Sequence, residues 1–246
     1  MNKKKVINEK VLIIIPTHND EKIISKNIAY IDSYIKKNFT ELKNYKIAVI
    51  ENGSCDNTKI ICKRLSKKYS NISFSYLIKK GRGGALRYAM KKNKADIYCY
   101  MDSDLSTNLS CFKNLIENMQ SYDILIGTRY HPSSKIKRGF RRLFLSKIYN
   151  KLVQLFFKVR FSDFQCGFKA FNKKVIKNLL PQIQDNSWFF DTEFLIIAYK
   201  NNYKIYELPI IWKESSNSSV KIFRDSIYHL IKLFELRIRL WQNERR

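Results

Sequence analysis

The sequence predicts an α/β fold in which a mostly parallel sheet is covered by helices on both faces. Three observations lead to this prediction. Apolar runs rich in Ile, Val and Tyr alternate with amphipathic segments of about 10 to 15 residues, which is the pattern of βαβ units. Hydrophobic residues make up 45% of the 246 residues and aromatics 14%, which excludes an intrinsically disordered chain. No internal repeat and no Pro- or Gly-rich linker divides the sequence.

The expected elements follow one another in a regular order. β-Branched and aromatic runs predict strands at residues 11–15, 47–50, 72–78, 97–101 and 124–126. Apolar residues at helical spacing predict helices over about 20–37, 56–69, 83–93 and 109–120. A serine-rich stretch at 215–219 is interpreted as a loop. We therefore expect one α/β domain, residues 1–218, followed by a helical tail, residues 219–246.

The chain is strongly basic, with 47 Lys and Arg against 21 Asp and Glu and a net charge of +26. Such an excess predicts an anionic partner, which is nucleic acid, a membrane surface or a phosphorylated substrate. Part of the excess reflects a lysine-rich composition. It is also local, because residues 124–162 contain ten basic residues and no acidic one. A positive field is therefore expected around this segment.

The beginning of the chain carries no signal for export or membrane insertion. Residues 1–10 are polar and lysine-rich, and the apolar run 11–15 is too short for a spanning helix or a signal peptide. Five cysteines without a C-x-x-C pair are expected to be reduced and mostly buried. These features predict a cytoplasmic protein.

Polar residues follow each predicted strand, at the sheet edge where α/β proteins bind ligands. Asp102-Ser103-Asp104 comes directly after the strand at 97–101. Two carboxylates one residue apart can hold Mg²⁺ or Mn²⁺ and leave positions open for diphosphate oxygens. The alternative is a loop that only caps the helix near residue 109. The position after the fourth strand favours the metal site.

Two further loops at this edge carry groups suited to a nucleotide. Glu51 and Asn52 end the second strand, where a carboxylate and an amide can hydrogen-bond a base or a ribose. Residues 79–84, K-K-G-R-G-G, place glycines and cations at a helix N-terminus, which suits a diphosphate. This loop is neither a Walker A loop nor a G-x-G-x-x-G loop.

Together these segments resemble a known family. The order P-T-H-N-D, E-N-G-S-C-D-N-T, K-K-G-R-G-G-A, D-S-D-L-S and G-T-R-Y is similar to that of the family-two GT-A glycosyltransferases. D-F-Q-C-G-F-K-A-F, W-F-F-D-T-E and E-L-P-I-I-W-K-E follow, and look most like the dolichyl-phosphate (polyprenyl-phosphate) glucose and mannose synthases. The resemblance covers about residues 11–221 and implies a GT-A, Rossmann-like fold.

The resemblance implies a binding site for a sugar nucleotide of the UDP-glucose or GDP-mannose type. Asp102 and Asp104 would hold Mg²⁺ or Mn²⁺ on its diphosphate. The implied donor-binding residues are Pro16, Thr17, His18, Asp20, Glu51, Asn52, Lys80, Gly83, Asp102, Ser103, Asp104 and Arg129.

The resemblance also implies an acceptor site within the basic segment. Arg129, Arg142 and Ser146 would bind the phosphate of a polyprenyl or dolichyl phosphate, for which an arginine fork is well suited. Asp104 would act in catalysis through the metal. Asp163 and Asp191 would orient the nucleophile, or act as base for an alcohol acceptor, although Asp163 is equally consistent with a structural cap.

The expected activity is transfer of a hexose to polyprenyl phosphate with inversion at the anomeric carbon. Glucose is favoured because E-S-S-N-S-S at 214–219 replaces the R-x-x-G-x-S-K segment of the mannose synthases. The alternative acceptor is a hydroxyl of a glycan or glycolipid. A nucleic-acid-binding protein is the remote alternative, and it is disfavoured because Asp102 and Glu51 would repel a polyanion. No nucleic-acid partner is expected.

The C-terminal tail carries an apolar stripe at helical spacing, surrounded by basic residues. The stripe consists of Val220, Phe223, Ile227, Leu230, Phe234, Ile238 and Trp241. An amphipathic helix of this kind binds anionic membrane surfaces, so the protein is expected to be peripheral on the cytoplasmic face of a membrane. The alternative is a helix that buries its stripe against the domain or a second subunit. The oligomeric state stays open.

Overall fold

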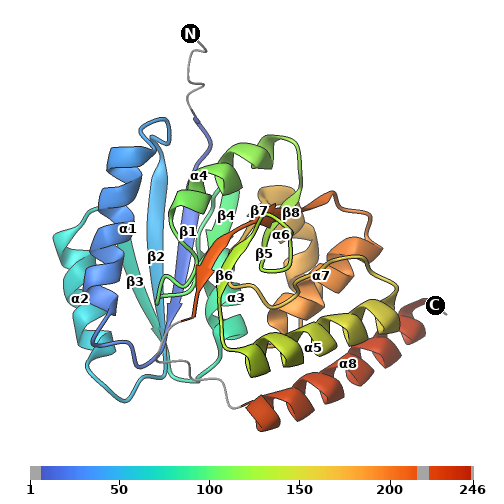
Figure 1. Ribbon diagram of the computed structural model, residues 1–246. Helices are drawn as coiled ribbons and strands as arrows, with labels where there is room; N and C mark the ends of the chain where they lie inside the picture. The colour runs from blue at the N-terminus through green and yellow to red at the C-terminus, as the bar shows by residue number, and fades with distance from the viewer. Residues whose placement is uncertain (1–6, 215–221, 245–246) are drawn as a thin grey trace.

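A computed structural model of the chain describes residues 7–214 and 222–244 (Figure 1). Its main sheet has seven strands in the order β3-β2-β1-β4-β7-β5-β8. The strands are β1 (Val11–Thr17), β2 (Tyr45–Asn52), β3 (Ile72–Leu77), β4 (Ile97–Tyr100), β5 (Ile124–Thr128), β7 (Lys169–Asn172) and β8 (Ile205–Pro209). Only β7 runs antiparallel to its neighbours, β4 and β5. The predicted, mostly parallel sheet is confirmed.

Eight helices lie in the described part of the chain. They are α1 (Ile24–Asn38), α2 (Thr58–Lys68), α3 (Arg82–Lys92), α4 (Ser110–Glu117), α5 (Phe140–Phe157), α6 (Lys173–Leu179), α7 (Phe190–Lys200) and α8 (Ile222–Glu244). The five predicted strands and four predicted helices all correspond to observed elements, with ends displaced by a few residues. The predicted helix over 109–120 is divided into α4 and a short 3-10 turn, Asn118–Gln120.

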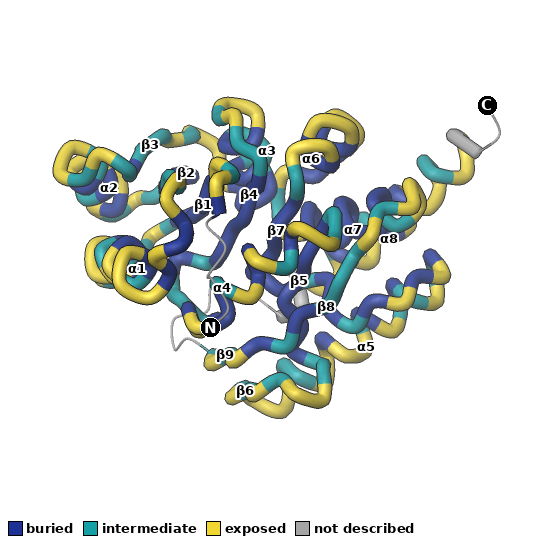
Figure 2. The backbone as a smooth tube through the Cα atoms, turned by 90° about the horizontal axis from the view of Figure 1, so that it is seen from above, coloured by how far each residue is buried: buried dark blue, intermediate teal, exposed yellow. Residues whose placement is uncertain are grey.

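The two faces of the sheet bury alternate residues of the same strands. On β1, Val11 and Ile13 join the core that contains α1, α2 and α4, whereas Leu12 and Ile14 join the core on the α3, α6 and α7 side. Successive side chains of a strand point to opposite faces, so a continuous apolar run fits a sheet that is covered on both sides. Figure 2 shows the buried strands between helices whose outer sides are exposed.

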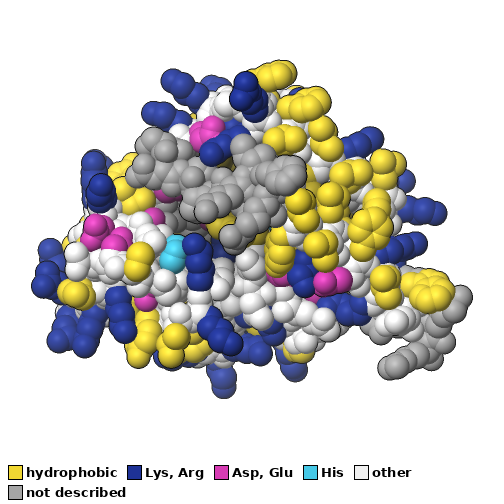
Figure 3. Space-filling view, turned by 90° about the horizontal axis from the view of Figure 1, so that it is seen from below, with side chains coloured by type: hydrophobic (Ala, Val, Ile, Leu, Met, Phe, Trp, Pro, Cys, Tyr) yellow, Lys and Arg dark blue, Asp and Glu magenta, His cyan; other side chains and the backbone are white. Residues whose placement is uncertain are grey.

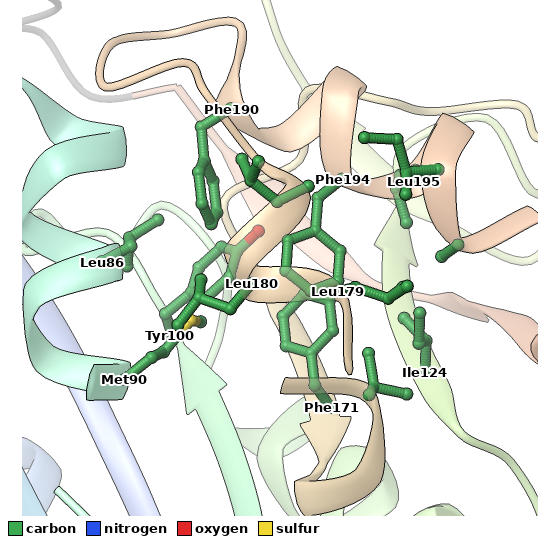
Figure 4. Close-up of a cluster of buried hydrophobic side chains, with 14 of the residues drawn as sticks. Leu86, Met90, Tyr100, Ile124, Phe171, Leu179, Leu180, Phe190, Phe194 and Leu195 are labelled. Carbon is green, nitrogen blue, oxygen red and sulfur yellow. The ribbon is translucent and has the colours of Figure 1, made fainter. Parts of the chain in front are cut away.

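Aromatic side chains fill the core on the α3, α6 and α7 side, beneath the carboxyl ends of the strands. Tyr100, at the end of β4, stacks on Phe171 of β7, and Phe171 packs against Phe194 of α7 (Figure 4). Phe190 packs on Phe194 one turn away. This cluster holds α7 against the sheet directly behind the loop that contains the paired aspartates.

The C-terminal half of the fold contains elements that the sequence did not predict. These are β7, β8, α5, α6, α7 and a second, two-stranded parallel sheet of β6 (Lys135–Lys137) and β9 (Ile211–Lys213). Strands of three to five residues and an antiparallel insertion are weak signals in a pattern of alternating strands and helices. The basic segment at residues 124–162, which contains no acidic residue, forms β5, β6 and the long helix α5.

The predicted C-terminal helix is present as α8 and lies beside α5 (Figure 1). The predicted boundary at residues 218 and 219 falls outside the described residues, as do the stripe residue Val220 and the side chain of Phe223. Leu233 and Leu236 pack into the core of the domain. None of the helices in the described ranges is long and apolar enough to cross a membrane.

Candidate active site

Asp20, in the loop after β1, connects three segments at the carboxyl edge of the sheet. Its carboxylate accepts hydrogen bonds from Thr17 Oγ1 and from Ser103 Oγ, both at 2.6 Å. Its backbone N–H donates to Thr58 Oγ1 at the start of α2, at 2.8 Å. Asp20 therefore fixes the loops after β1 and β4 against each other, and three predicted donor-binding residues meet at this point.

Asn52, the last residue of β2, is buried and joins three loops. Its Nδ2 donates to the backbone oxygen of Thr17 (2.8 Å), and its Oδ1 accepts from the backbone N–H of Gly81 (3.1 Å). Its own backbone oxygen lies 3.0 Å from His18 Nδ1. Because these groups come from the loops after β1 and β3, Asn52 determines their relative positions.

Glu51 and Pro16 lie at the same edge but have little contact with solvent. Glu51 is buried and accepts a hydrogen bond from the backbone N–H of Ser54 in its own loop. Pro16 is buried in β1, opposite Ile50 of β2. The structure therefore brings both residues to the predicted nucleotide edge, where they support the loops that surround it.

Asp102, the first of the paired aspartates, is connected to a buried ionic network. Its Oδ1 accepts hydrogen bonds from Arg82 Nη2 (3.1 Å) and Nε (3.2 Å). Arg82 also pairs with Asp191 of α7, which accepts from Lys169 Nζ (2.7 Å) and from the Tyr100 hydroxyl. Arg82, Lys169, Asp191 and Tyr100 are all buried, so the network continues from the aspartate loop into the core.

The surroundings of Asp102 favour a bound cation. Burial raises the pKa of the Asp102 carboxyl, Arg82 opposes this rise, and the negative charges of Asp104 and Asp191 add to it. Its side chain nevertheless keeps 42% of its surface accessible. A Cβ on Gly167 would lie 1.9 Å from Asp102 Oδ2, so only glycine leaves room for this carboxylate. An accessible carboxylate whose charge is partly uncompensated is suited to a metal ion.

Asp104 lies on the same loop and is tied to its own backbone turn. Ser106 donates to it twice, from its backbone N–H (3.0 Å) and from its hydroxyl (2.8 Å). Within residues 7–214 and 222–244, no group of three or more His, Cys, Asp or Glu side chains could hold a metal ion. Mg²⁺ and Mn²⁺ commonly take one or two carboxylates and complete their coordination with phosphate and water. Asp102 and Asp104 fit a metal of this kind.

The start of α3 differs from the diphosphate cradle that the sequence predicts. The N–H groups of Gly83 and Gly84 donate to the backbone oxygens of Ser187 (3.0 Å) and Asn186 (2.8 Å). A Cβ on Gly83 would lie 2.9 Å from backbone atoms of both residues. This geometry gives Gly83 a packing role, and Lys80, two residues before α3, is exposed. The donor-binding roles of Gly83 and Lys80 stay predictions.

Arg129 and Asp163 form a closed, buried pair. Arg129 Nε and Nη2 lie 2.7 and 2.8 Å from the two Asp163 carboxylate oxygens, and the Arg129 backbone N–H donates to Oδ2 at 3.0 Å. Although burial opposes ionisation, the Arg129 guanidinium and these hydrogen bonds hold the pKa of Asp163 below its usual value. Arg129 therefore directs two of its nitrogens inward, toward Asp163.

Beside this pair, arginine side chains and hydroxyl groups form a cluster at the N-terminal end of α5. Arg138 Nη1 donates to Ser146 Oγ (2.9 Å), and the Tyr130 hydroxyl also bonds Ser146. Arg142 Nη1 lies 2.7 Å from Glu214 Oε1, just after β9. The structure thus places Arg138, Arg142 and Ser146 in one cluster, and their binding of an acceptor phosphate stays a prediction.

Trp212 of β9 holds two arginines of this region on its ring. The guanidinium carbons of Arg129 and Arg138 both lie 5.5 Å from the ring centroid, a distance at which a cation interacts with an aromatic face. Burial, and the positive charge of Arg129, lower the pKa of Arg138. The ring therefore keeps two mutually repelling cations close together.

β9 also joins the aspartate loop to the arginine cluster. The Lys213 N–H donates to the Ser106 backbone oxygen (2.8 Å), and Trp212 bridges to Thr107. On its other side β9 pairs with β6, where Trp212 lies opposite Ile136. The predicted metal loop and the predicted acceptor site are thus neighbours through one short strand.

Two of the predicted catalytic carboxylates are placed away from solvent. Asp163 is fully buried on Arg129, and Asp191 is 3% exposed and held by Arg82, Lys169 and Tyr100. Although burial opposes ionisation, Arg82 and Lys169 hold the pKa of Asp191 below its usual value. Both groups are therefore placed to position other residues instead of exchanging protons with a substrate. The third predicted catalytic carboxylate, Asp104, lies two residues after Asp102 on the loop that follows β4.

Sequence reasoning did not assign roles to Arg82, Lys169, Arg138, Trp212 or Glu214. Each lies in a segment that the sequence had already marked: Arg82 in K-K-G-R-G-G, Lys169 in G-F-K-A-F and Arg138 in the basic segment. The feature that could have identified them is a charged or aromatic side chain close in sequence to a predicted site residue. Their partners lie far away in sequence, so contacts between them were not visible.

A doubly covered α/β sheet with paired aspartates at its carboxyl edge and an arginine cluster beside them is the arrangement that the sequence predicts for a nucleotide-sugar-dependent transferase. The chain belongs to Glycosyl transferase family 2, whose sequence model matches residues 12–180. It is therefore a glycosyltransferase, as the sequence predicts.

Relatives of this chain agree with this assignment. Glycosyltransferase AglD of Haloferax volcanii is 32% identical over 218 residues, which cover 87% of this chain but only 35% of AglD. The dolichyl-phosphate beta-glucosyltransferase of Saccharomyces cerevisiae is 28% identical, with 87% of this chain and 70% of the relative covered. The protein of the same name from Dictyostelium discoideum is 29% identical, with 97% and 77% covered.

The fold also matches solved structures. Glucosyl-3-phosphoglycerate synthase of Mycobacterium tuberculosis, in complex with Mn²⁺, UDP and glucosyl-3-phosphoglycerate, superposes with a TM-score of 0.69 at 15% identity. The match covers 92% of this chain and 80% of that structure. The predicted GT-A fold class is therefore confirmed.

Proposed function

We propose that the protein transfers glucose from a nucleotide diphosphate sugar of the UDP-glucose type to the phosphate of a polyprenyl lipid, with inversion at the anomeric carbon. The observation that carries this proposal is the connection made by β9. Its backbone bonds to the loop of Asp104 and Ser106, and its side chain Trp212 holds Arg129 and Arg138. A donor diphosphate and an acceptor phosphate would thus be held side by side.

Asp102 and Asp104 are the residues that would hold Mg²⁺ or Mn²⁺. A divalent metal supplies positive charge for the leaving diphosphate. Arg82 already neutralises one oxygen of Asp102, and the buried pair of Asp191 and Lys169 fixes Arg82 in place. These residues would therefore keep the aspartate loop in one arrangement while the diphosphate binds.

Arg138, Arg142 and Ser146 are the proposed ligands of the acceptor phosphate. Arg129, which is paired with Asp163, shares the ring of Trp212 with Arg138 and so helps to position it. A phosphate monoester is largely a dianion at neutral pH, so it is a nucleophile that needs no proton removed. This agrees with the burial of Asp163 and Asp191, which leaves neither of them in the position of a general base.

The relatives support the choice of sugar and acceptor. Two of them are named dolichyl-phosphate beta-glucosyltransferases, and the solved neighbour contains UDP with a glucosyl product. We also propose that the protein works at the surface of an anionic membrane on the cytoplasmic side. Exposed apolar residues on α5 and α8 support this placement, because α5 also carries Arg142 and Ser146 and α8 packs beside it.

A transfer assay tests the proposal. Purified protein would be incubated with Mg²⁺ or Mn²⁺, a short polyprenyl phosphate and labelled UDP-glucose, GDP-mannose or UDP-N-acetylglucosamine. We expect label in the lipid from UDP-glucose alone, and a loss of about 100-fold or more in Asp104→Asn, because this change removes a metal ligand.

Asp96→Asn is the matched control, because Asp96 precedes the other end of β4 and pairs with Lys173 on the surface. It should keep the activity of the unchanged chain. Transfer to a glycan or glycolipid hydroxyl, but not to the lipid phosphate, would overturn the proposed acceptor. A protein that bound none of the sugar nucleotides would overturn the whole proposal.

A further inference from the structure

Glu214 brings a carboxylate into the arginine cluster. It follows β9, and its Oε1 lies 2.7 Å from Arg142 Nη1 and 3.9 Å from Arg138 Nε. Its Oε2 accepts a hydrogen bond from the backbone N–H of Gly139 at 3.0 Å. One side chain therefore engages both arginines and the N-cap residue of α5.

These donors are the ones that a phosphate monoester would use. Arginine forks and a backbone N–H at the start of a long helix bind carboxylates and phosphates in the same way. Arg129 is already paired with Asp163, so Glu214 is the carboxylate that faces Arg138 and Arg142 in the described part of the chain. A phosphate bound by the same groups would meet it directly.

The side chain of Glu214 is able to leave without disturbing the strands. Its backbone N–H donates to the Lys137 oxygen (2.9 Å), which anchors the main chain to β6. The side chain is 22% exposed and that of Arg142 is 29% exposed, so both can be reached from solvent. Rotation about side-chain bonds is enough to withdraw the carboxylate.

We propose that Glu214 is an internal substitute for the acceptor phosphate, which the phosphate must displace in order to bind Arg138 and Arg142. This inference rests on the proposed function, because it assigns the acceptor phosphate to this cluster. Glu214 keeps the arginines ordered and partly neutralised while no acceptor is present. It also selects for a strong anion, since a weaker one would not displace a carboxylate that accepts hydrogen bonds from Gly139 and Arg142 and is attracted by Arg138.

The proposal predicts that removal of a charge from the site strengthens binding. Glu214→Gln keeps an oxygen for the Gly139 N–H but loses its attraction to the arginines. We expect it to bind inorganic phosphate and citronellyl phosphate, a short prenyl phosphate, about three to ten times more tightly than the unchanged chain. Titration calorimetry on the full chain measures both dissociation constants, and melting temperatures check that the fold is kept.

Glu117→Gln is the matched control, because Glu117 is an exposed carboxylate that ends α4 and pairs with Lys113. It makes the same change in net charge and should leave both dissociation constants unchanged. Equal gains for the two ligands in Glu214→Gln would support displacement at the phosphate. A gain confined to citronellyl phosphate would place the effect on the prenyl chain and overturn the proposal.

The remaining outcomes separate this inference from the proposed function. If the unchanged chain binds citronellyl phosphate and Glu214→Gln binds it equally or more weakly, Glu214 orients the arginines and only this inference fails. If neither protein binds either phosphate while UDP-glucose still binds, the acceptor class in the proposed function fails as well.

Discussion

The pair of Arg129 and Asp163 shows how a single buried contact makes stability depend on pH. The pKa of Asp163 is held below its usual value in the folded protein. A carboxyl of this kind stabilises the fold above its unfolded pKa of about 3.9, and that stability is lost as the pH falls through the lower folded pKa. The unchanged chain should therefore lose free energy of unfolding on acidification below about pH 4.

Asp163→Asn should be destabilised at pH 7 by about 3–5 kcal/mol, because Arg129 would stay buried without its counter-ion. Its free energy of unfolding should also fall less steeply between about pH 5 and pH 2 than that of the unchanged chain. Urea denaturation at several pH values measures both effects. Arg129→Met together with Asp163→Asn is the control, and should recover part of the loss. Equal acid slopes in Asp163→Asn and the unchanged chain would contradict this explanation.

At the scale of single residues, the sequence identified the loops better than the role of each side chain. Asp102 and Asp104 share the loop after β4, and Arg142 and Ser146 share α5, because a motif fixes its own neighbours; their binding roles stay predictions. Asp191 did not match its predicted role, since Arg82 and Lys169 reach it from other parts of the chain. A buried ion pair depends on tertiary contacts, which the order of residues does not contain.

At the scale of elements, α3 is held against the loop before α7 by a close approach of two backbones. The position of Gly83 leaves no room for a side chain, since a Cβ there would lie 2.7 Å from Phe190 Cβ and 2.9 Å from the Ser187 backbone oxygen. The same loop lies beside Gly84, where a Cβ would meet its nearest atoms at an ordinary 3.6 Å. The two glycines therefore have different tolerances.

Gly83→Ala should cost about 1–3 kcal/mol of stability, because backbone atoms would have to move. Gly84→Ala is the matched control in the same turn of α3, and should be neutral or slightly stabilising, since alanine favours helix by about 1 kcal/mol over glycine. Urea denaturation of both variants makes the comparison. Equal effects would show that helix propensity, and not the contact with residues 186 and 187, decides the result.

Elements through residue 128 and the C-terminal helix α8 were predictable, and most of those between them were not. Parallel strands with helices between them repeat through residue 128, and each apolar run is long enough to be recognised. After that, β7 inserts antiparallel between β4 and β5, with the buried Lys169 at its start. From the sequence alone, Lys169 would be assigned to the surface, because its partner Asp191 lies 22 residues away.

At the scale of the whole molecule, α5 and α8 together present an apolar surface. The large hydrophobic side chains exposed on these helices are Phe140, Phe144, Leu145, Ile148, Leu155, Ile227, Leu230, Ile231, Phe234, Ile238 and Trp241. Figure 3, seen from below, shows hydrophobic side chains gathered on the side where these helices lie in Figure 1. The predicted stripe of α8 is therefore exposed wherever the structure describes it, which removes burial against the domain as its explanation.

The exposed residues of α8 and its buried ones lie on nearly opposite sides of the helix. His229, Leu233 and Leu236 are buried against the domain, and the stripe lies on the other side of the helix, where Phe234 contacts the ring of Phe156 on α5. Basic residues accompany the apolar ones, among them Lys147 and Lys151 on α5 and Arg237 on α8, all exposed. Apolar side chains surrounded by cations match the chemistry of an anionic membrane surface. This surface is covered either by lipid or by a second copy of the chain, and lipid is the covering that its charge favours.

Vesicle binding decides between these two coverings. The chain should sediment with vesicles of phosphatidylcholine and phosphatidylglycerol more than with phosphatidylcholine alone, because anionic lipid attracts the basic residues. Ile238→Ser should weaken this binding by about tenfold, since a side chain that is 55% exposed would no longer enter the lipid. Ile60→Ser on α2 is the matched control, because Ile60 is 51% exposed on a helix packed against the opposite edge of the sheet. If both variants bind vesicles equally and Ile238→Ser instead converts a dimer into a monomer in light scattering, the surface joins two subunits. If Ile238→Ser instead loses vesicle binding and both proteins are monomeric, lipid covers this surface. The arginines proposed to bind the acceptor would then lie at a membrane, where a lipid phosphate is found.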